Sequence, residues 1–300
     1  MKRSYNLFAP HEPIKCRGED RMKVAVMTDS TAYIPKEERE KHHIHMVPLS
    51  VTFNDVSYQE EIDIQAEEFY QKMKDASELP TTSQPSIGFI TNKLEELAKD
   101  YDAVISIHLS SGISGTYQAV ASAGEMVEGI DVYAFDSEIS CMPQGFYALE
   151  AAEMAKNDIT PEEILNRLDE IKATMRAYFM VDDLTNLQKG GRLSGAQALV
   201  GGLLQIKPVL HFVDKVIVPF EKIRTRKKAM NRIMGMLEED AIKGDLKVAF
   251  IHANDEASAK ELQENFSNKY PNIETTISYF GPVIGTHLGE GAIGVGWYTK

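Results

Sequence analysis

Three segments rich in serine and threonine are the strongest candidates for ligand binding in this 300-residue sequence. They are residues 28–31 (TDST), 81–86 (TTSQPS) and 110–116 (SSGISGT). Hydroxyls and free backbone N–H groups at a turn hold an anion by hydrogen bonds, and the dipole of a following helix strengthens the attraction. Gly112 and Gly115 permit positive φ and close approach of the backbone to a ligand. N-caps and plain turns use the same residue types, but three such segments together predict a shared site for an acidic group.

A histidine near the C-terminus, His287, lies among glycines in residues 285–291 (GTHLGEG). A neutral imidazole offers one hydrogen-bond donor and one acceptor, so it suits the same kind of ligand. A second interpretation is a hydrolase or transferase with Ser111 or Ser114 as nucleophile and His287 as base. That chemistry needs an acid oriented on the histidine, and Glu290 is the near candidate in the sequence. A third interpretation is a binding protein for another anionic metabolite.

The sequence lacks the signatures of several other chemistries. It contains no G-x-S-x-G, no Walker A motif and no G-x-G-x-x-G that follows a predicted strand. His42, His43 and His45 lie close together, but no carboxylate or cysteine at ligand spacing accompanies them. We therefore predict a binding protein with no catalytic residue, no metal site and no cofactor.

Composition narrows the partners and the compartment. The net charge of −13 argues against a nucleic-acid partner, because phosphate binding needs a basic face. No apolar run approaches the roughly 18–20 residues that span a bilayer. Cys16 and Cys141 form neither a disulfide framework nor a metal-ligand pattern, which favours the reducing cytoplasm. Residues 1–21 have no periodic apolar pattern and no apolar core of a signal peptide, so we expect a tag, an extended start or a disordered arm.

Basic residues form a local group in this acidic chain. Residues 189–194 (KGGRLS) place Arg192 on a tight loop, and Gly190 is expected to end a short helix over 184–189 in a left-handed cap. Further along the chain come Lys207, Arg224, Arg226, Lys227 and Lys228. A guanidinium in such a group suits recognition of carboxylate or phosphate, so docking of an acidic or phosphate-bearing partner is one interpretation. A solvated helix start is the other.

Strands and helices alternate along the first half, which predicts βαβ units and a mostly parallel sheet. The predicted strands are residues 23–27, 44–51, 103–107 and 132–135. The predicted helices are residues 63–74, 86–99 (capped by Ser86), 116–127 and 144–155.

The second half predicts a mixed sheet, because a hairpin does not occur in a purely parallel one. Thr160 followed by Pro161 is typical of a helix start, and this helix should run to about residue 174. The remaining predicted helices are 225–239 and 258–269. The remaining predicted strands are 178–181, 247–252, 274–279 and a hairpin of 209–213 with 216–220 around Asp214-Lys215. A glycine-rich tail, 281–296, is expected to close the chain. We predict two domains, 22–158 and 159–300.

In this order the segments resemble the DegV family of bacterial fatty-acid-binding proteins, from residue 24 to about residue 297. The motifs that carry the resemblance are VAVMTDST (24–31), TSQPS (82–86), LSSGISGTYQA (109–119), DDLTNLQKGGRLS (182–194), LLQIKPVL (203–210), IRTRKKA (223–229) and GTHLGEG (285–291). The resemblance implies a two-domain α/β fold, with a parallel-sheet N-terminal domain, a mixed-sheet α/β C-terminal domain and a long-chain fatty acid buried between them. The family commonly has H-T-G-P-G at the last motif and glycine in the hairpin turn, and this chain departs from both.

The resemblance also implies roles for individual residues. The carboxylate of the fatty acid would be held by Thr82, by Ser111 or Ser110, and by His287. Supporting loop residues would be Thr28, Asp29, Ser30, Ser83, Gly112, Ser114 and Thr286. The characterised branch, FakB, presents its fatty acid to an ATP-dependent fatty acid kinase, FakA, and the acyl phosphate feeds phospholipid synthesis. Docking to that kinase would use Arg192, Arg224, Arg226 and Lys227, and transient contact with a membrane is compatible with this role.

Overall fold

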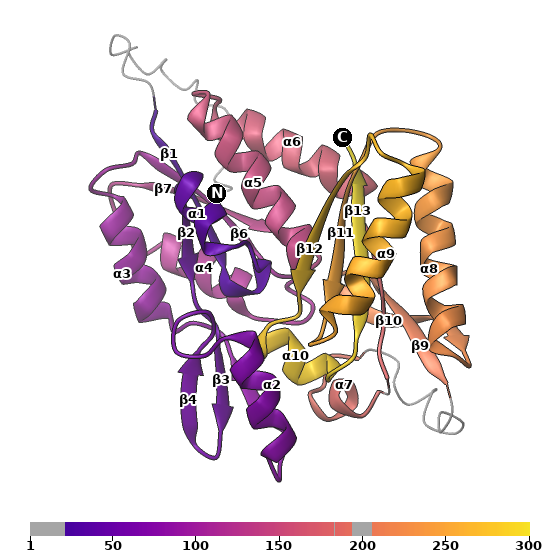
Figure 1. Ribbon diagram of the computed structural model, residues 1–300. Coiled ribbons are helices and arrows are strands. Elements are labelled where there is room, and N and C mark those ends of the chain that lie inside the picture. The colour runs from indigo at the N-terminus through magenta and orange to yellow at the C-terminus, as the bar shows by residue number, and fades with distance from the viewer. Residues whose placement is uncertain (1–21, 183, 194–205) are drawn as a thin grey trace, which may run out of the picture.

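The computed structural model describes residues 22–182, 184–193 and 206–300 (Figure 1). The predicted N-terminal arm, 1–21, lies outside the described residues. So do Asp183 and Ser194 of one motif and residues 203–205 of another.

The first sheet is parallel, as the alternation of strands and helices predicted. Its order is β2 (Ile44–Val47), β1 (Val24–Asp29), β6 (Ala103–His108) and β7 (Asp131–Asp136). Strand β6 is buried along its whole length because helices cover both faces of the sheet. The helices α3 (Ile87–Leu97) and α4 (Thr116–Gly124) pack on one face, and α5 (Met142–Lys156) packs on the other. The Ser86 side chain caps α3 as predicted, accepting from the N–H of Phe89.

The second sheet is mixed, as the hairpin predicted. Its order is β10 (Val216–Ile223), β9 (Lys207–Val213), β8 (Arg176–Met180), β13 (Ile293–Thr299), β11 (Leu246–His252) and β12 (Glu274–Tyr279), with the pair β11–β12 parallel and the other pairs antiparallel. Helices α8 (Arg226–Ala241) and α9 (Glu256–Lys269) cover the outer face, while α5 and α6 (Pro161–Thr174) lie between the two sheets (Figure 1). Thr160 begins α6 with a reciprocal capping box.

The glycine-rich tail contains a helix and a strand that were not predicted. Residues 281–296 contain helix α10 (Pro282–Leu288) and most of β13, which pairs with both β8 and β11 inside the second sheet. The glycines serve close packing instead. A Cβ at Gly296 would come within 2.4 Å of Pro143 Cγ, and one at Gly294 within 2.9 Å of the Phe280 ring. Glycine in a strand therefore marks close approach here, although it weakens the strand pattern in the sequence.

The predicted strand 44–51 is two strands that belong to different sheets. Pro48 separates β2 from β3 (Ser50–Phe53), and a proline has no N–H to continue a ladder. Strand β3 lies in a third sheet between β4 (Val56–Gln59) and β5 (Thr81–Ser83), both antiparallel to it. Thr82 thus lies on a short strand, paired with Val51, and not in a turn. Helices α1 (Lys36–Lys41), a short polar helix that was not predicted, and α2 (Ala66–Asp75) complete this half.

Two turns of the second half can be compared with their predictions. The hairpin turn is confirmed, and Asp214 and Lys215 both have positive φ, as a two-residue turn of this kind requires. The left-handed cap at Gly190 is wrong. Gly190 ends α7 (Thr185–Lys189) with φ −75°, and Gly191 is the residue with positive φ. In the described part of the chain, no helix has the length and apolarity that crossing a membrane would require.

Candidate functional site

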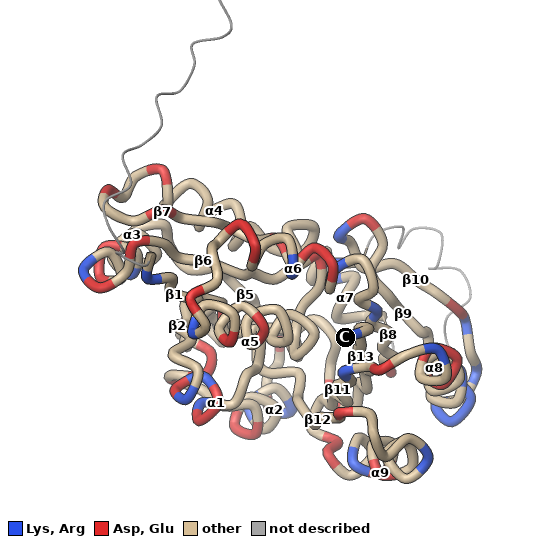
Figure 2. Tube along the Cα trace, turned by 90° about the horizontal axis from the view of Figure 1, so that it is seen from above, with Lys and Arg blue, Asp and Glu red and all other residues tan. Residues whose placement is uncertain are grey.

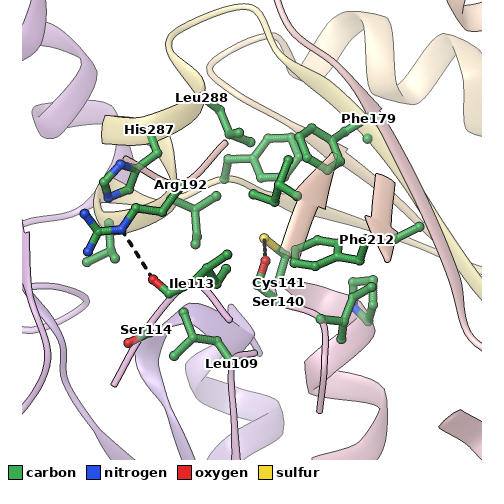
Figure 3. A pocket seen from close by; sticks show the side chains of 18 of the residues that line it. Leu109, Ile113, Ser114, Ser140, Cys141, Phe179, Arg192, Phe212, His287 and Leu288 are labelled. Atoms are coloured by element: carbon green, nitrogen blue, oxygen red, sulfur yellow. Dashed lines mark hydrogen bonds between the residues drawn. The ribbon is translucent and has the colours of Figure 1, made fainter. Parts of the chain in front are cut away.

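A largely apolar cavity of about 280 Å³ lies between the first and second sheets. Its walls come from the turn after β6, the start of α5, strands β8, β11 and β13, the β9–β10 hairpin and α10. Apolar side chains from these elements include Ile113, Phe179, Phe212, Ile217 and Val283. Figure 3 shows Phe179 and Phe212 on one side of the space and His287, Arg192 and Ser114 on the other. The cavity therefore has an apolar end and a polar end.

The polar end brings together residues that are far apart in the sequence. Thr82 Oγ1 lies 2.9 Å from Nε2 of His287, although 205 positions separate the two residues. Strand β5 fixes Thr82 by its ladder with β3, and α10 carries His287 into the same space. The other ring nitrogen, Nδ1, is buried without a hydrogen-bond partner. The imidazole of His287 therefore has one nitrogen paired with Thr82 and one without a partner, and it lies beside an apolar cavity.

Arg192 also lines the polar end. Its Nε donates to the carbonyl of Ile113 at 3.3 Å, and its Nη1 donates to the carbonyl of Gly190. Burial, and next the positive charge of Arg192, lower the pKa of His287 to about 4. The imidazole is therefore neutral at pH 7 and offers one donor, while the guanidinium supplies the positive charge.

The serines of the 110–116 segment face different ways. Ser110 Oγ donates to the carbonyl of Lys215 at 2.6 Å, and Ser111 Oγ donates to Asp136 Oδ2 at 2.5 Å. Burial raises the pKa of Asp136, but the bonds from Ser111 and Lys215 hold it below its ordinary value overall. Neither Ser110 nor Ser111 lines the cavity, whereas Ser114 does. Ser114 thus lines the same cavity as Thr82 and His287, with its Oγ 2.8 Å from Thr116 Oγ1, while the two expected serines are bonded to partners outside the cavity.

Neither glycine of this segment has positive φ, contrary to the reason given for them from the sequence. Lack of space is what excludes a side chain at both positions. A Cβ at Gly112 would lie 2.3 Å from the backbone oxygen of Lys215, and one at Gly115 would lie 2.2 Å from Gln84 Oε1. Gly112 therefore lets the tip of the β9–β10 hairpin rest on the turn after β6.

Most of the expected supporting residues do not line the cavity but bond to the loops around it. Asp29 accepts from Thr31, from the N–H of Leu109 and from His108, and although burial raises its pKa, these bonds keep the value low. Thr28 and Thr286 donate to the backbone carbonyls of Ile107 and Pro282. Of this set, Ser83 and Ser114 line the cavity. The others shape the loops that surround it.

A buried Ser–His–Asp chain was not foreseen from the sequence. Ser106 Oγ lies 2.6 Å from His108 Nε2, and His108 Nδ1 lies 3.0 Å from Asp29 Oδ2. All three side chains are fully buried, and none of them lines the cavity. Asp29 also accepts from the Leu109 N–H, so these three hydrogen-bonded side chains anchor the turn after β6. A histidine two residues after a serine on a buried strand was the available signal.

The acid required by the hydrolase interpretation is engaged elsewhere. Glu290 Oε1 accepts from Asn254 Nδ2 at 2.6 Å and pairs with Lys74 Nζ at 3.0 Å. It therefore orients neither nitrogen of His287. The same two contacts account for how this chain carries a glutamate in its last motif. Among the described residues, no group of histidine, cysteine and acidic side chains is placed to hold a metal ion.

The basic residues divide into exposed and structural ones. Arg224 and Lys227 are exposed where β10 ends and α8 begins, in the run of basic residues that Figure 2 shows there. Arg226 donates to the carbonyl of Gly291 and to Asp255, so it holds the loop before β13. Arg192 lies at the cavity. Of the four residues expected to dock a partner, Arg192 and Arg226 thus donate to backbone carbonyls, and Arg224 and Lys227 are the exposed ones.

The sequence and the fold were compared with those of known proteins. Residues 23–300 match the family model described as "Uncharacterised protein, DegV family". Protein DegV of Bacillus subtilis is 62% identical over 281 residues, which cover 93% of this chain and 100% of that protein. The crystal structure of DegV, a fatty acid binding protein from Bacillus subtilis, has 61% identity, a TM-score of 0.89 and the same coverage. A DegV family protein from Thermus thermophilus, whose fatty acid binding was studied by structure, has 30% identity, a TM-score of 0.87, and coverage of 93% and 100%. This chain therefore belongs to the DegV family.

Proposed function

We propose that this protein binds a long-chain fatty acid in the cavity between its first and second sheets, with the carboxylate at Thr82, Ser114 and His287. The observation that carries the proposal is an apolar cavity that ends at a buried imidazole and a threonine hydroxyl. The fatty acid binding of the Bacillus subtilis and Thermus thermophilus relatives supports it. The division into domains 22–158 and 159–300, with the ligand between them, is part of the proposal.

The two ends of the cavity have different tasks. Each CH₂ group that leaves water contributes about 0.8 kcal/mol, so the tail supplies most of the affinity. An unpaired carboxylate would oppose burial, and the polar end provides the hydrogen bonds that offset this cost. If Nε2 of His287 donates to Thr82, the threonine hydroxyl is free to donate to the carboxylate. The polar end thus fixes which end of the ligand a partner can reach.

We propose further that the protein is a carrier, not an enzyme, and presents the carboxylate to a fatty acid kinase. The kinase would transfer a phosphoryl group from ATP to a carboxylate oxygen, and the acyl phosphate would enter phospholipid synthesis. Arg192 lies at the polar end, and Arg224 and Lys227 are exposed on the second half of the chain, which suits an acidic or phosphate-bearing partner. A cytoplasmic location and transient membrane contact belong to the same proposal.

The proposal is tested by identifying the lipid that copurifies with the protein. Mass spectrometry of a solvent extract should show a fatty acid of about 14–20 carbons in near-stoichiometric amount, as expected for a largely apolar pocket. A different anionic metabolite in the extract would replace the proposal by the third interpretation. Turnover of acyl esters by the purified protein, lost in Ser114→Ala, would favour the hydrolase.

Arg192→Ala is expected to leave fatty acid bound while slowing phosphorylation by the kinase about tenfold or more, because truncating a docking arginine typically has such an effect. The measurements are lipid content of the purified variant and acyl phosphate formed per minute with a fatty acid kinase. Lys260→Ala is the matched control, since Lys260 lies on α9 and pairs with Glu256. An empty cavity in Arg192→Ala would show that the arginine holds the ligand and not the partner.

A further inference from the structure

Glu60 is a fully buried carboxyl group outside the cavity, and three hydrogen-bonding groups surround it. Its Oε2 lies 2.6 Å from Ser30 Oγ. Its Oε1 accepts from the hydroxyl of Tyr33 at 2.8 Å and from the backbone N–H of Val283 at 2.7 Å. The ion pairs of the described residues include none to Glu60, which is 0% exposed. A buried acid without a cation needs another way to be accommodated.

The contacts of Glu60 converge on the start of α10. Val283 is the second residue of this helix, and the next N–H, that of Ile284, donates to the Tyr33 hydroxyl at 3.3 Å. Both Val283 and Ile284 line the cavity, and His287 follows one turn after Val283 on the same helix. Gly281 permits this close packing, because a Cβ there would meet the Tyr33 ring at 2.3 Å. The place of His287 thus depends on Glu60 and Tyr33.

The hydrogen bonds around Glu60 suit a neutral carboxylic acid. Ser30 Oγ accepts from the N–H of Leu49 at 3.1 Å and has capacity for a second donor. A proton on Oε2 can therefore point at Ser30 Oγ, while Oε1 keeps accepting from Tyr33 and Val283. Burial raises the pKa of Glu60 to about 8, although its three hydrogen bonds oppose the rise. The acid form is then the main one at pH 7.

The titratable neighbours agree with a neutral group. Tyr33, Tyr70, Tyr279 and Cys141 all have a pKa raised first by burial, so they carry no charge near pH 7. Glu61 is the acidic neighbour on the same segment. Burial also raises its pKa, and it accepts from the Tyr279 hydroxyl.

We propose that Glu60 is a positioning residue that, as a neutral acid, holds the start of α10 and so keeps His287 in place for the ligand's carboxylate. The inference rests on the proposed function for its ligand.

The test compares Glu60→Gln with Glu60→Ala. A glutamine can donate from its amide to Ser30 Oγ and accept from Tyr33 and Val283, which imitates the neutral acid. We expect Glu60→Gln to bind a fluorescent fatty acid within about twofold of the parent protein and Glu60→Ala to bind about tenfold more weakly, as loss of buried hydrogen bonds implies. Because the effect passes through His287, Glu60→Ala should cause little further loss in a His287→Ala background. If Glu60→Ala does not fold, Tyr33→Phe replaces it in this cycle.

The second measurement is urea unfolding between pH 5 and 8 without ligand. The folded parent keeps the Glu60 proton up to about pH 8, whereas the unfolded chain loses it near 4.5. Raising the pH across this window therefore lowers the stability of the parent relative to Glu60→Gln. If the difference in free energy of unfolding between the parent and Glu60→Gln does not change with pH, the proposal that Glu60 is a neutral acid is overturned. Equal loss of affinity in Glu60→Gln and Glu60→Ala would overturn it too. If folded Glu60→Ala keeps the parent's affinity for fatty acid while His287→Ala binds it more weakly, the positioning role is overturned. Unchanged affinity in His287→Ala would contradict the proposed head-group site instead.

Discussion

His287→Ala is expected to weaken fatty-acid binding by about 10- to 100-fold at pH 7, because Thr82 loses the Nε2 donor that leaves its hydroxyl free for the carboxylate, and a hydrogen bond to a charged group contributes roughly 1.5–3 kcal/mol. The substitution removes the buried imidazole and leaves Thr82 without the partner that lies 2.9 Å away. Since the pKa of His287 is lowered to about 4, the lost group is a neutral donor and not a cation. Displacement of a fluorescent fatty acid from delipidated protein measures the change.

The serine variants control this prediction. Ser114→Ala should weaken binding by up to about tenfold, whereas Ser111→Ala should stay within about twofold, because one lost hydroxyl contact contributes roughly 0.5–1.5 kcal/mol. Ser111→Ala removes a bond to Asp136 and no group that lines the cavity. A larger loss of affinity in Ser111→Ala than in Ser114→Ala would show that Ser111, the serine expected from the sequence, contacts the carboxylate. Urea unfolding of each variant separates binding from stability.

Local signals in the sequence predicted much of the fold. The strands of the first sheet are short apolar runs that alternate with amphipathic helices, so a mostly parallel sheet could be predicted from this pattern, although the order of its strands could not. The caps Ser86 and Thr160 and the Asp214-Lys215 turn need only their immediate neighbours, and each lies where it was predicted. The family resemblance gave the architecture of both halves.

Tertiary packing hid the remaining elements. The glycines of β13 suppress a strand pattern, yet they are required because Pro143 and Phe280 lie against the strand. The run 44–51 reads as one strand, and only the pairing of β3 with β4 and β5 shows that Pro48 divides it between two sheets. In both cases the deciding contacts come from residues distant in the sequence.

The candidate site was predicted in part for the same reason. Thr82 and His287 were chosen by motif, and the structure brings them together. Which serine faces the cavity depends on Asp136 at the end of β7, which takes the hydroxyl of Ser111. Glu60 gave no signal at all, because an acid in a polar run (QEEID) looks exposed until the fold surrounds it.

Gly112→Ala is expected to reduce the free energy of unfolding by about 2–3 kcal/mol, the sum of an overpacked contact and one lost hydrogen bond. The new Cβ would lie 2.3 Å from the backbone oxygen of Lys215, and a backbone atom cannot move aside as a flexible side chain can. The hairpin tip must then lift, which breaks the 2.6 Å bond from Ser110 to the same oxygen. Urea unfolding without ligand measures the loss.

The same variant should also release fatty acid faster, because Phe212 and Ile217 on the two strands of this hairpin form part of the cavity wall. Stopped-flow dissociation of a fluorescent fatty acid measures that rate. Gly235→Ala is the matched control, since a Cβ at this position in α8 meets nothing within 4 Å. A glycine inside a helix is less stable than alanine by about 0.5–1 kcal/mol, so the control should gain stability and keep the parent's dissociation rate. If Gly112→Ala is as stable as the parent, the hairpin tip is not held against the turn after β6, and the wall of the cavity must be fixed by other contacts.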